Sequence, residues 1–162
     1  MTVLFGSIFV GTTAVQGKVL KTPFENIGVM SGYDPGTSWI SGNVQHVRDA
    51  INKFTFIVGP IEGDSFAYVD VMNNNLETGV GVGSGFMEIV GTWVGDDEFN
   101  GLEIYLYGQM ILRNEGTFYT GWANAHGTLG DYSIHMKGDF ITAFNPALGL
   151  ANTMTGVLTI HL

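Results

Sequence analysis

The segment Tyr132-Ser-Ile-His-Met-Lys137 alternates apolar and polar side chains along its whole length. Successive side chains of a β-strand point to opposite faces of a sheet, so this period of two predicts a strand with one buried face. The dipeptide Gly130-Asp131 just before it is typical of a hairpin turn, because glycine readily adopts a positive φ. The same alternation recurs in Met154–His161.

Further segments have the same strand character, since each is rich in apolar residues and is bounded by Gly, Asn, Asp or Pro. They are Val3–Val10, Gln16–Lys21, Phe54–Val58, Phe66–Met72, Phe86–Val94, Leu102–Leu112 and Thr117–Asn124. Many short strands without intervening helices are typical of sandwiches and barrels, and closure into a barrel removes exposed strand edges. We therefore expect residues 1–162 to form a single all-β domain, a closed antiparallel β-barrel of about eight or more strands in largely meander order.

One segment gives a conflicting signal. Its apolar residues are spaced as on a helix: Val44, Val47, Ile51 and Phe54. Asn43 could cap such a helix, yet Trp39–Ile40 before it and Phe54–Val58 after it have strand character. We expect a long extended segment over Asn43–Phe54, with one short helix as the alternative.

A Gly-Asp pattern recurs in three places that begin at Gly59, Gly91 and Gly127. The spacing between the copies fits two strands plus two turns, so each copy could be the same hairpin end of a meander. This predicts that the turns near Gly63, Gly95 and Gly130 crowd one end of the barrel. Chance in a glycine-rich chain is the alternative.

Composition limits the classes of function. The chain has 162 residues, 24 of them glycine, with 13% charged residues and a formal net charge of −9. An acidic surface repels phosphate, so we expect no nucleic-acid partner and no binding to anionic membranes. The absence of cysteine excludes disulfides and thiolate metal sites.

Localisation is only weakly indicated. The first residues lack the basic region and the long apolar stretch of a signal peptide, and no apolar run is long enough for a membrane helix. A cytoplasmic protein is the default expectation. A secreted protein whose leader has been trimmed is the alternative.

The segment Trp122-Ala-Asn-Ala-His-Gly-Thr-Leu-Gly-Asp-Tyr-Ser-Ile-His-Met-Lys-Gly138 resembles the glycine-rich hairpin of the allene oxide cyclase and dirigent type of small barrel. The middle glycine of that pattern is replaced here by Leu129. Ile40–Asn43 and Thr155–Ile160 also lie where such barrels place strands. The resemblance covers about a third of the chain and implies a barrel with a pocket. Barrels of that type include both cyclases and non-enzymatic ligand-binding proteins. No catalytic residue of the type lies in a motif that this sequence matches.

Metal and phosphate chemistry have little support. The four histidines, His46, His126, His135 and His161, form no recognisable ligand motif, so we expect no metal and no cofactor. Gly79–Gly85 superficially resembles a phosphate loop but lacks the Lys-Ser/Thr pair, and a glycine-rich strand or hairpin is the better interpretation. The acidic run Asp96–Glu98 could bind a cation, although solvated carboxylates in a turn are commoner.

Two ionisable residues are candidates for general acid–base catalysis: Glu88 and His126. Glu88 lies in a strongly apolar segment, and burial in a cavity raises the pKa of a carboxyl group towards neutrality. His126 adjoins the Gly127 turn, where a structural hydrogen bond is the alternative role. Glu103 is a second carboxylate of the same kind, and both carboxylates could instead face solvent.

Large aromatic residues could form the wall of an interior pocket: Trp93, Tyr105, Tyr107, Tyr119 and Trp122, with Phe118 beside them. Rings of this size fill a barrel whether or not it binds a ligand, so core packing is the alternative. The favoured function is an interior pocket for an apolar small molecule, with metal-free cyclase or isomerase activity if the protein is an enzyme. The alternatives are a structural or self-associating barrel, with a possible homo-oligomer, and a carbohydrate-binding module.

Overall fold

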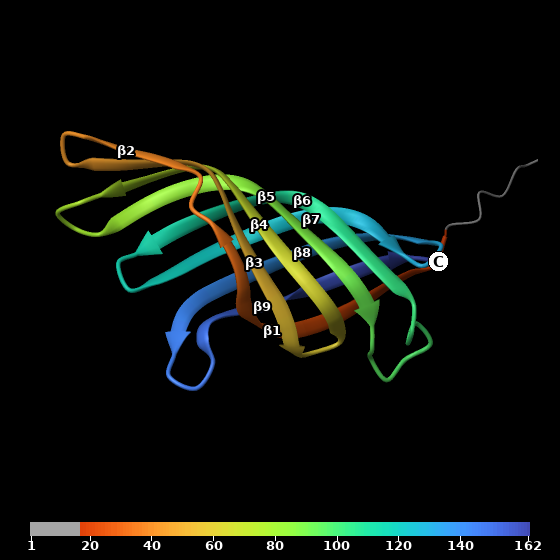
Figure 1. Ribbon diagram of the computed structural model, residues 1–162. Helices are drawn as coiled ribbons and strands as arrows, with labels where there is room; N and C mark the ends of the chain where they lie inside the picture. The colour runs from red at the N-terminus through yellow and green to blue at the C-terminus, as the bar shows by residue number, and fades with distance from the viewer. Residues whose placement is uncertain (1–16) are drawn as a thin grey trace, which may run out of the picture.

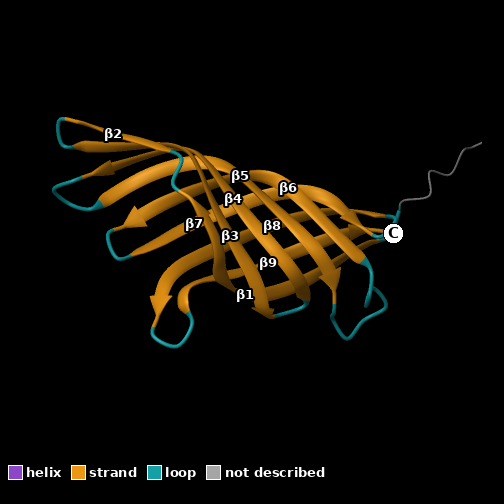
Figure 2. Cartoon of the chain, viewed as in Figure 1, coloured by secondary structure: helices purple, strands orange, loops and turns teal. Residues whose placement is uncertain are grey.

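The computed structural model describes residues 17–162, and this range contains nine strands and no helix (Figures 1 and 2). The strands are β1 (Val19–Asp34), β2 (Thr37–Ser41), β3 (Val44–Val58), β4 (Ile61–Asn75), β5 (Val80–Trp93), β6 (Glu103–Glu115), β7 (Phe118–Leu129), β8 (Tyr132–Asn145) and β9 (Gly149–His161). They include well over half of the described residues, as the alternation predicts. Within that range no helix long and apolar enough to cross a bilayer is found. The expected strand Val3–Val10 lies outside the described residues.

The strands close into an eight-stranded antiparallel barrel. From β3 to β9 each strand pairs with the next in the chain, and β1 pairs with β9 over Val19–Val29. The second half of β1, Ile27–Asp34, pairs with β3 and completes the ring (Figure 1). β2 pairs only with β3 among the described strands, so it is an extra edge strand outside the ring. The prediction of a closed, largely meander barrel is confirmed.

Asp49 changes the phase of β3 within Asn43–Phe54. The segment is extended as part of β3, but Asp49 has a positive φ of 57° and is left out of the pairing with β4, while the register is the same on both sides of it. Val47 and Ala50 both line the barrel interior although they are three residues apart. The extended interpretation is confirmed. Val44 and Ile51 do not line the cavity, so the four apolar residues at helical spacing do not share one face of the strand.

Glycine has two roles in the barrel. Nine of the described glycines have positive φ, including Gly130 in the β7–β8 turn, as expected of hairpin turns. A second set lies within strands, in phase with buried side chains; Gly81, Gly83 and Gly85 of β5 are examples. A Cβ atom on Gly85 would lie 1.8 Å from the carbonyl oxygen of Tyr68. These glycines therefore permit the close strand approach that a small, strongly coiled barrel requires, which composition alone did not indicate.

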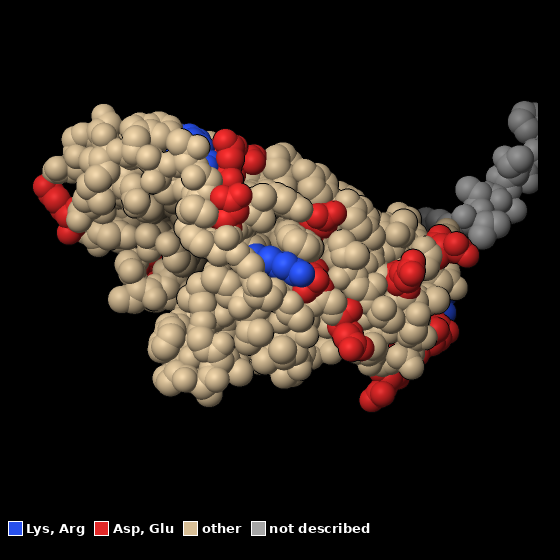
Figure 3. Space-filling model, in the orientation of Figure 1, with Lys and Arg blue, Asp and Glu red and all other residues tan. Residues whose placement is uncertain are grey.

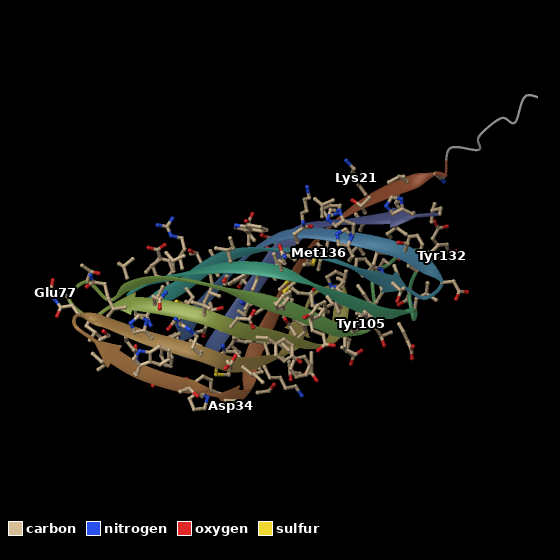
Figure 4. The ribbon with its side chains drawn as sticks, turned by 90° about the horizontal axis from the view of Figure 1, so that it is seen from above. Lys21, Asp34, Glu77, Tyr105, Tyr132 and Met136 are labelled. Atoms are coloured by element: carbon tan, nitrogen blue, oxygen red, sulfur yellow. The ribbon has the colours of Figure 1, made fainter. Side chains whose placement is uncertain are left out.

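The two ends of the barrel differ. The packed end carries the β3–β4, β5–β6 and β7–β8 connections. The three copies of the Gly-Asp pattern lie at this end, near Gly63, Gly95 and Gly130, as predicted. The cavity end carries the β4–β5, β6–β7 and β8–β9 connections. Figure 4 shows Tyr132 at the packed end and Glu77 at the opposite, cavity end.

The loop between β5 and β6 plugs the packed end. Trp93 is 1% exposed, and its indole N–H donates to both carboxylate oxygens of Asp97, at 2.9 and 3.0 Å. Asp97 also accepts the backbone N–H of Phe99, whose buried ring meets Tyr132 edge to face. In the acidic run Asp96–Glu98, Asp97 therefore holds the plug in place through hydrogen bonds.

Candidate functional site

A cavity of about 390 Å³ occupies the half of the barrel away from the plug. Its wall is formed by Met30, Tyr33, Val47, Ala50, Asn52, Phe54, Ser65, Ala67, Val69, Met72, Asn74, Met87, Met110, Leu112, Tyr119, Phe140, Thr142, Leu150, Asn152 and Met154. Small-molecule sites are typically clefts of about 300–1,000 Å³ with mostly apolar walls and a few polar groups. This cavity has the size and the composition of such a site.

Small side chains and one bulge lie beside the space. Ala50 on β3 and Ala67 on β4 present only methyl groups to the interior. The register between β4 and β5 shifts between Tyr68 and Val71, across the β3–β4 ladder from Asp49. At the packed end, by contrast, large side chains such as Trp93 fill the interior. The same barrel is therefore solid at one end and hollow at the other.

The wall is mostly apolar but contains hydrogen-bonding groups. The amide of Asn152 donates to the hydroxyl of Thr142 at 2.7 Å, and both residues are buried. Tyr119 and Tyr33 contribute phenol groups. Burial, followed by the proximity of Tyr33, raises the pKa of Tyr119 above its ordinary value of 10.0, so its hydroxyl stays protonated and can donate at neutral pH.

Of the five aromatic residues proposed for the pocket wall, Tyr119 lines this cavity. Trp93 belongs to the packed end, where core packing is its role. Tyr105, Tyr107 and Trp122 are each more than 40% exposed and alternate with buried neighbours, so their rings lie on the outer face of the barrel. Phe118, named beside them, is also exposed.

Glu88 and His126 also lie outside the cavity. Glu88 alternates with the buried Met87 and Ile89, and its carboxylate accepts the hydroxyl of Tyr68 at 2.9 Å on the outer face. His126 is exposed and stacks on His135, with ring centroids 4.4 Å apart. Glu88 faces outward because placing it inside would expose Met87 and Ile89. Burial of each of these two side chains contributes about 1.5–3 kcal/mol of stability. Glu103 is exposed as well.

Three of the candidate residues, Glu88, Tyr107 and His126, lie next to one another, but on the outer surface of the barrel. Cross-strand pairing places Glu88 beside Tyr107, Tyr107 beside His126, and His126 beside His135. The hydrogen bond to Glu88 raises the pKa of the Tyr68 phenol above its ordinary value. A catalytic or binding role for these residues stays a prediction, and it would have to be exercised at this outer surface.

Acidification is expected to weaken the fold through His135. Burial, and then the positive charges of His126, Lys137 and His161, lower the pKa of His135 below its ordinary value of 6.5. A lowered pKa means that the folded state favours the neutral form of His135. The contribution of His135 to folding stability is therefore complete above about pH 6.5 and is lost as the pH falls through the lowered pKa. Denaturant unfolding between pH 7.5 and pH 5.5 should show a steeper loss of stability for the wild type than for His135→Gln.

An equal slope in the two proteins would contradict this assignment. Asp64 does not interfere in that window. Its hydrogen bonds to Thr55 and Lys53 outweigh the effect of burial and lower its pKa from the ordinary 3.8, so its contribution is lost only at more acidic pH.

Charge is sparse on the outer surface. Figure 3 shows scattered acidic groups and few basic ones on one face, in keeping with the net charge of −9. Two ion pairs occur in the described part of the chain, Lys53–Asp64 at 2.9 Å and Arg113–Glu115 at 3.7 Å. Within residues 17–162 no three His, Asp or Glu side chains come together as a metal-binding group.

The edge strand β2 is the feature that bears on self-association. All five of its residues are exposed, including Trp39 and Ile40, and its outer edge is unpaired in the described chain. Arg48 lies 5.1 Å from the centre of the Trp39 ring and places a charge beside this edge. Nearby charges are one way in which natural edge strands discourage pairing with other chains. A homo-oligomer stays a prediction.

Most of the cavity wall was missed at the sequence level. The signal that could have found it is the phase of each strand, since Ile104, Leu106 and Met110 are in one phase of β6 and the tyrosines in the other. Aliphatic residues gather on the buried phase because they carry no polar atom that needs a partner, whereas tyrosine keeps its hydroxyl in water.

Comparison with protein family models, with curated proteins and with solved structures finds no match for this chain. The resemblance to the allene oxide cyclase and dirigent type of barrel therefore stays a prediction.

Proposed function

We propose that this barrel binds a small apolar molecule inside the cavity at its open half. The observation that carries the proposal is the contrast between the two ends of one interior. Side chains fill the packed end completely enough to bury Trp93 and Phe99, whereas the other half retains about 390 Å³. Protein interiors normally pack without voids much larger than a water molecule, so retained space of this size supports a binding role.

The wall chemistry favours holding a ligand over acid–base catalysis. Within residues 17–162, no side-chain carboxylate, imidazole or amine lies among the residues that line the cavity. Proton transfer there would fall to phenols such as that of Tyr119, whose pKa burial raises above the ordinary 10.0. Cyclisation or isomerisation guided by the shape of the cavity is compatible with the same wall.

Filling the cavity tests the proposal. Ala67→Phe adds a ring to the cavity wall, and we expect it to lower the affinity for the neutral dye Nile red at least tenfold, because the ring occupies the ligand's space. Ala147→Phe is the matched control, since Ala147 is exposed in the β8–β9 turn. Fluorescence titration measures both variants, and circular dichroism verifies the fold.

Equal affinity in wild type, Ala67→Phe and Ala147→Phe would place the dye elsewhere and contradict the proposal. Native mass spectrometry of the purified wild type provides a second readout: a retained apolar molecule should be lost in Ala67→Phe and kept in Ala147→Phe.

A further inference from the structure

The described part of the chain contributes no charged side chain to the cavity wall. The six basic residues of the chain are Lys18, Lys21, Arg48, Lys53, Arg113 and Lys137, and none of them lines the cavity. Lys53 instead pairs with Asp64, and Arg48 lies over Trp39. No acidic residue or histidine of the described range lines the cavity either. A charged ligand group inside it would therefore lose its hydration without gaining a counter-ion.

That loss is large for a carboxylate or an ammonium group, because an unpaired charge is very unfavourable in an apolar environment. The net charge of −9 adds repulsion for anions that approach the barrel. The wall therefore selects against fatty acids and other anions, and the lack of a lining carboxylate selects against amines.

The buried Thr142–Asn152 pair provides an anchor for an uncharged polar group. Their mutual hydrogen bond uses one N–H of Asn152 and one lone pair of the Thr142 hydroxyl. Within the described chain, the second amide N–H, the amide oxygen and the hydroxyl proton have no other side-chain partner. Both residues line the cavity, so this remaining capacity can serve a ligand hydroxyl or carbonyl.

Methionine is the commonest residue type in the apolar part of the wall. Five of the seven methionines line the cavity: Met30, Met72, Met87, Met110 and Met154. Their side chains are flexible and polarisable, and they make favourable contacts with aromatic rings. Such a wall adapts to the outline of an apolar body, including a planar one.

We infer that the cavity takes uncharged molecules with an apolar body and one hydroxyl or carbonyl group, which hydrogen-bonds to the Thr142–Asn152 pair. This inference rests on the proposed cavity-binding function and adds the ligand class.

Three probes that share one body separate the contributions: 2-naphthol and naphthalene, which are uncharged at pH 7, and 2-naphthoate, which is anionic. By calorimetric titration of the full chain, 2-naphthol should bind about tenfold more tightly than naphthalene, which corresponds to one hydrogen bond. 2-Naphthoate should bind at least a hundredfold more weakly than 2-naphthol.

Thr142→Val removes the hydroxyl with little change in shape. It should reduce the preference for 2-naphthol over naphthalene to about twofold, while Thr155→Val, at an exposed position of β9, should leave the preference unchanged. Binding of 2-naphthoate as tight as that of 2-naphthol would overturn the charge selection, and a preference unaffected by Thr142→Val would overturn the anchor. Failure of all three probes to bind the wild type would instead contradict the cavity-binding function itself.

Discussion

Gly108→Ala is expected to destabilise the barrel by about 3 kcal/mol or more, towards the upper limit for a single methyl group. Gly108 lies in β6, in phase with the buried Leu106 and Met110. An added Cβ atom would lie 2.1 Å from the carbonyl oxygen of Asn124 and 2.3 Å from the Cα of Ala125. Both atoms belong to the backbone of β7, which is hydrogen-bonded to β6 and cannot move without breaking the ladder.

Two other glycines provide graded controls. An added Cβ on Gly138 would have its nearest contact at 2.9 Å, so Gly138→Ala should be less harmful. On Gly17 the nearest contact would be 3.5 Å, and Gly17→Ala should be neutral or slightly stabilising because it restricts the unfolded chain. Urea unfolding followed by far-ultraviolet circular dichroism gives the three free energies. A Gly108→Ala protein as stable as Gly17→Ala would show that the strands do not approach as described.

Trp93→Ala is expected to reduce the free energy of unfolding by about 3–5 kcal/mol. The indole is almost fully buried at the packed end, and its removal also leaves Asp97 without two of its hydrogen bonds. Asp97→Ala should be less costly, about 1–3 kcal/mol, because it removes the acceptor and leaves the indole in place. The two substitutions should be less than additive, since they disrupt the same contact.

Trp122→Ala is the matched control. Trp122 is 44% exposed on the outer face, so the same substitution should change stability by no more than about 0.5 kcal/mol. Unfolding is followed by circular dichroism, because tryptophan fluorescence changes with the number of tryptophans. If Trp122→Ala were as destabilising as Trp93→Ala, the assignment of one ring to the interior and the other to the surface would be incorrect.

The architecture was predictable because its signals are local. Alternation marks strands such as β8, and glycine or aspartate marks the turns between them. The Gly-Asp pattern also predicted that three connections lie at one end of the barrel, because in a meander every second turn lies at the same end. The segment around Asp49 was ambiguous because the positive φ of Asp49 accompanies a change of phase in β3, which interrupts the period of two.

The site was much less predictable, since alternation separates two faces without saying which is inside. Glu88 and Tyr107 were candidates for the interior, with the outer face as the alternative for Glu88 and core packing for Tyr107, and both lie outside because their aliphatic neighbours gain more from burial. The cavity depends on where small residues such as Ala50 and Ala67 meet across strands. That meeting is set by strand register and bulges, which a single sequence does not reveal.

The central claim is that one half of this barrel is hollow and receives an apolar molecule while the other half is solid. Methyl NMR of methionine-labelled protein, titrated with 2-naphthol, tests it directly. The signals of the five cavity methionines should shift saturably with one common affinity, whereas Met136, fully buried outside the cavity wall, should not move. Unchanged cavity signals at saturating ligand, or a response confined to Met136, would contradict the claim.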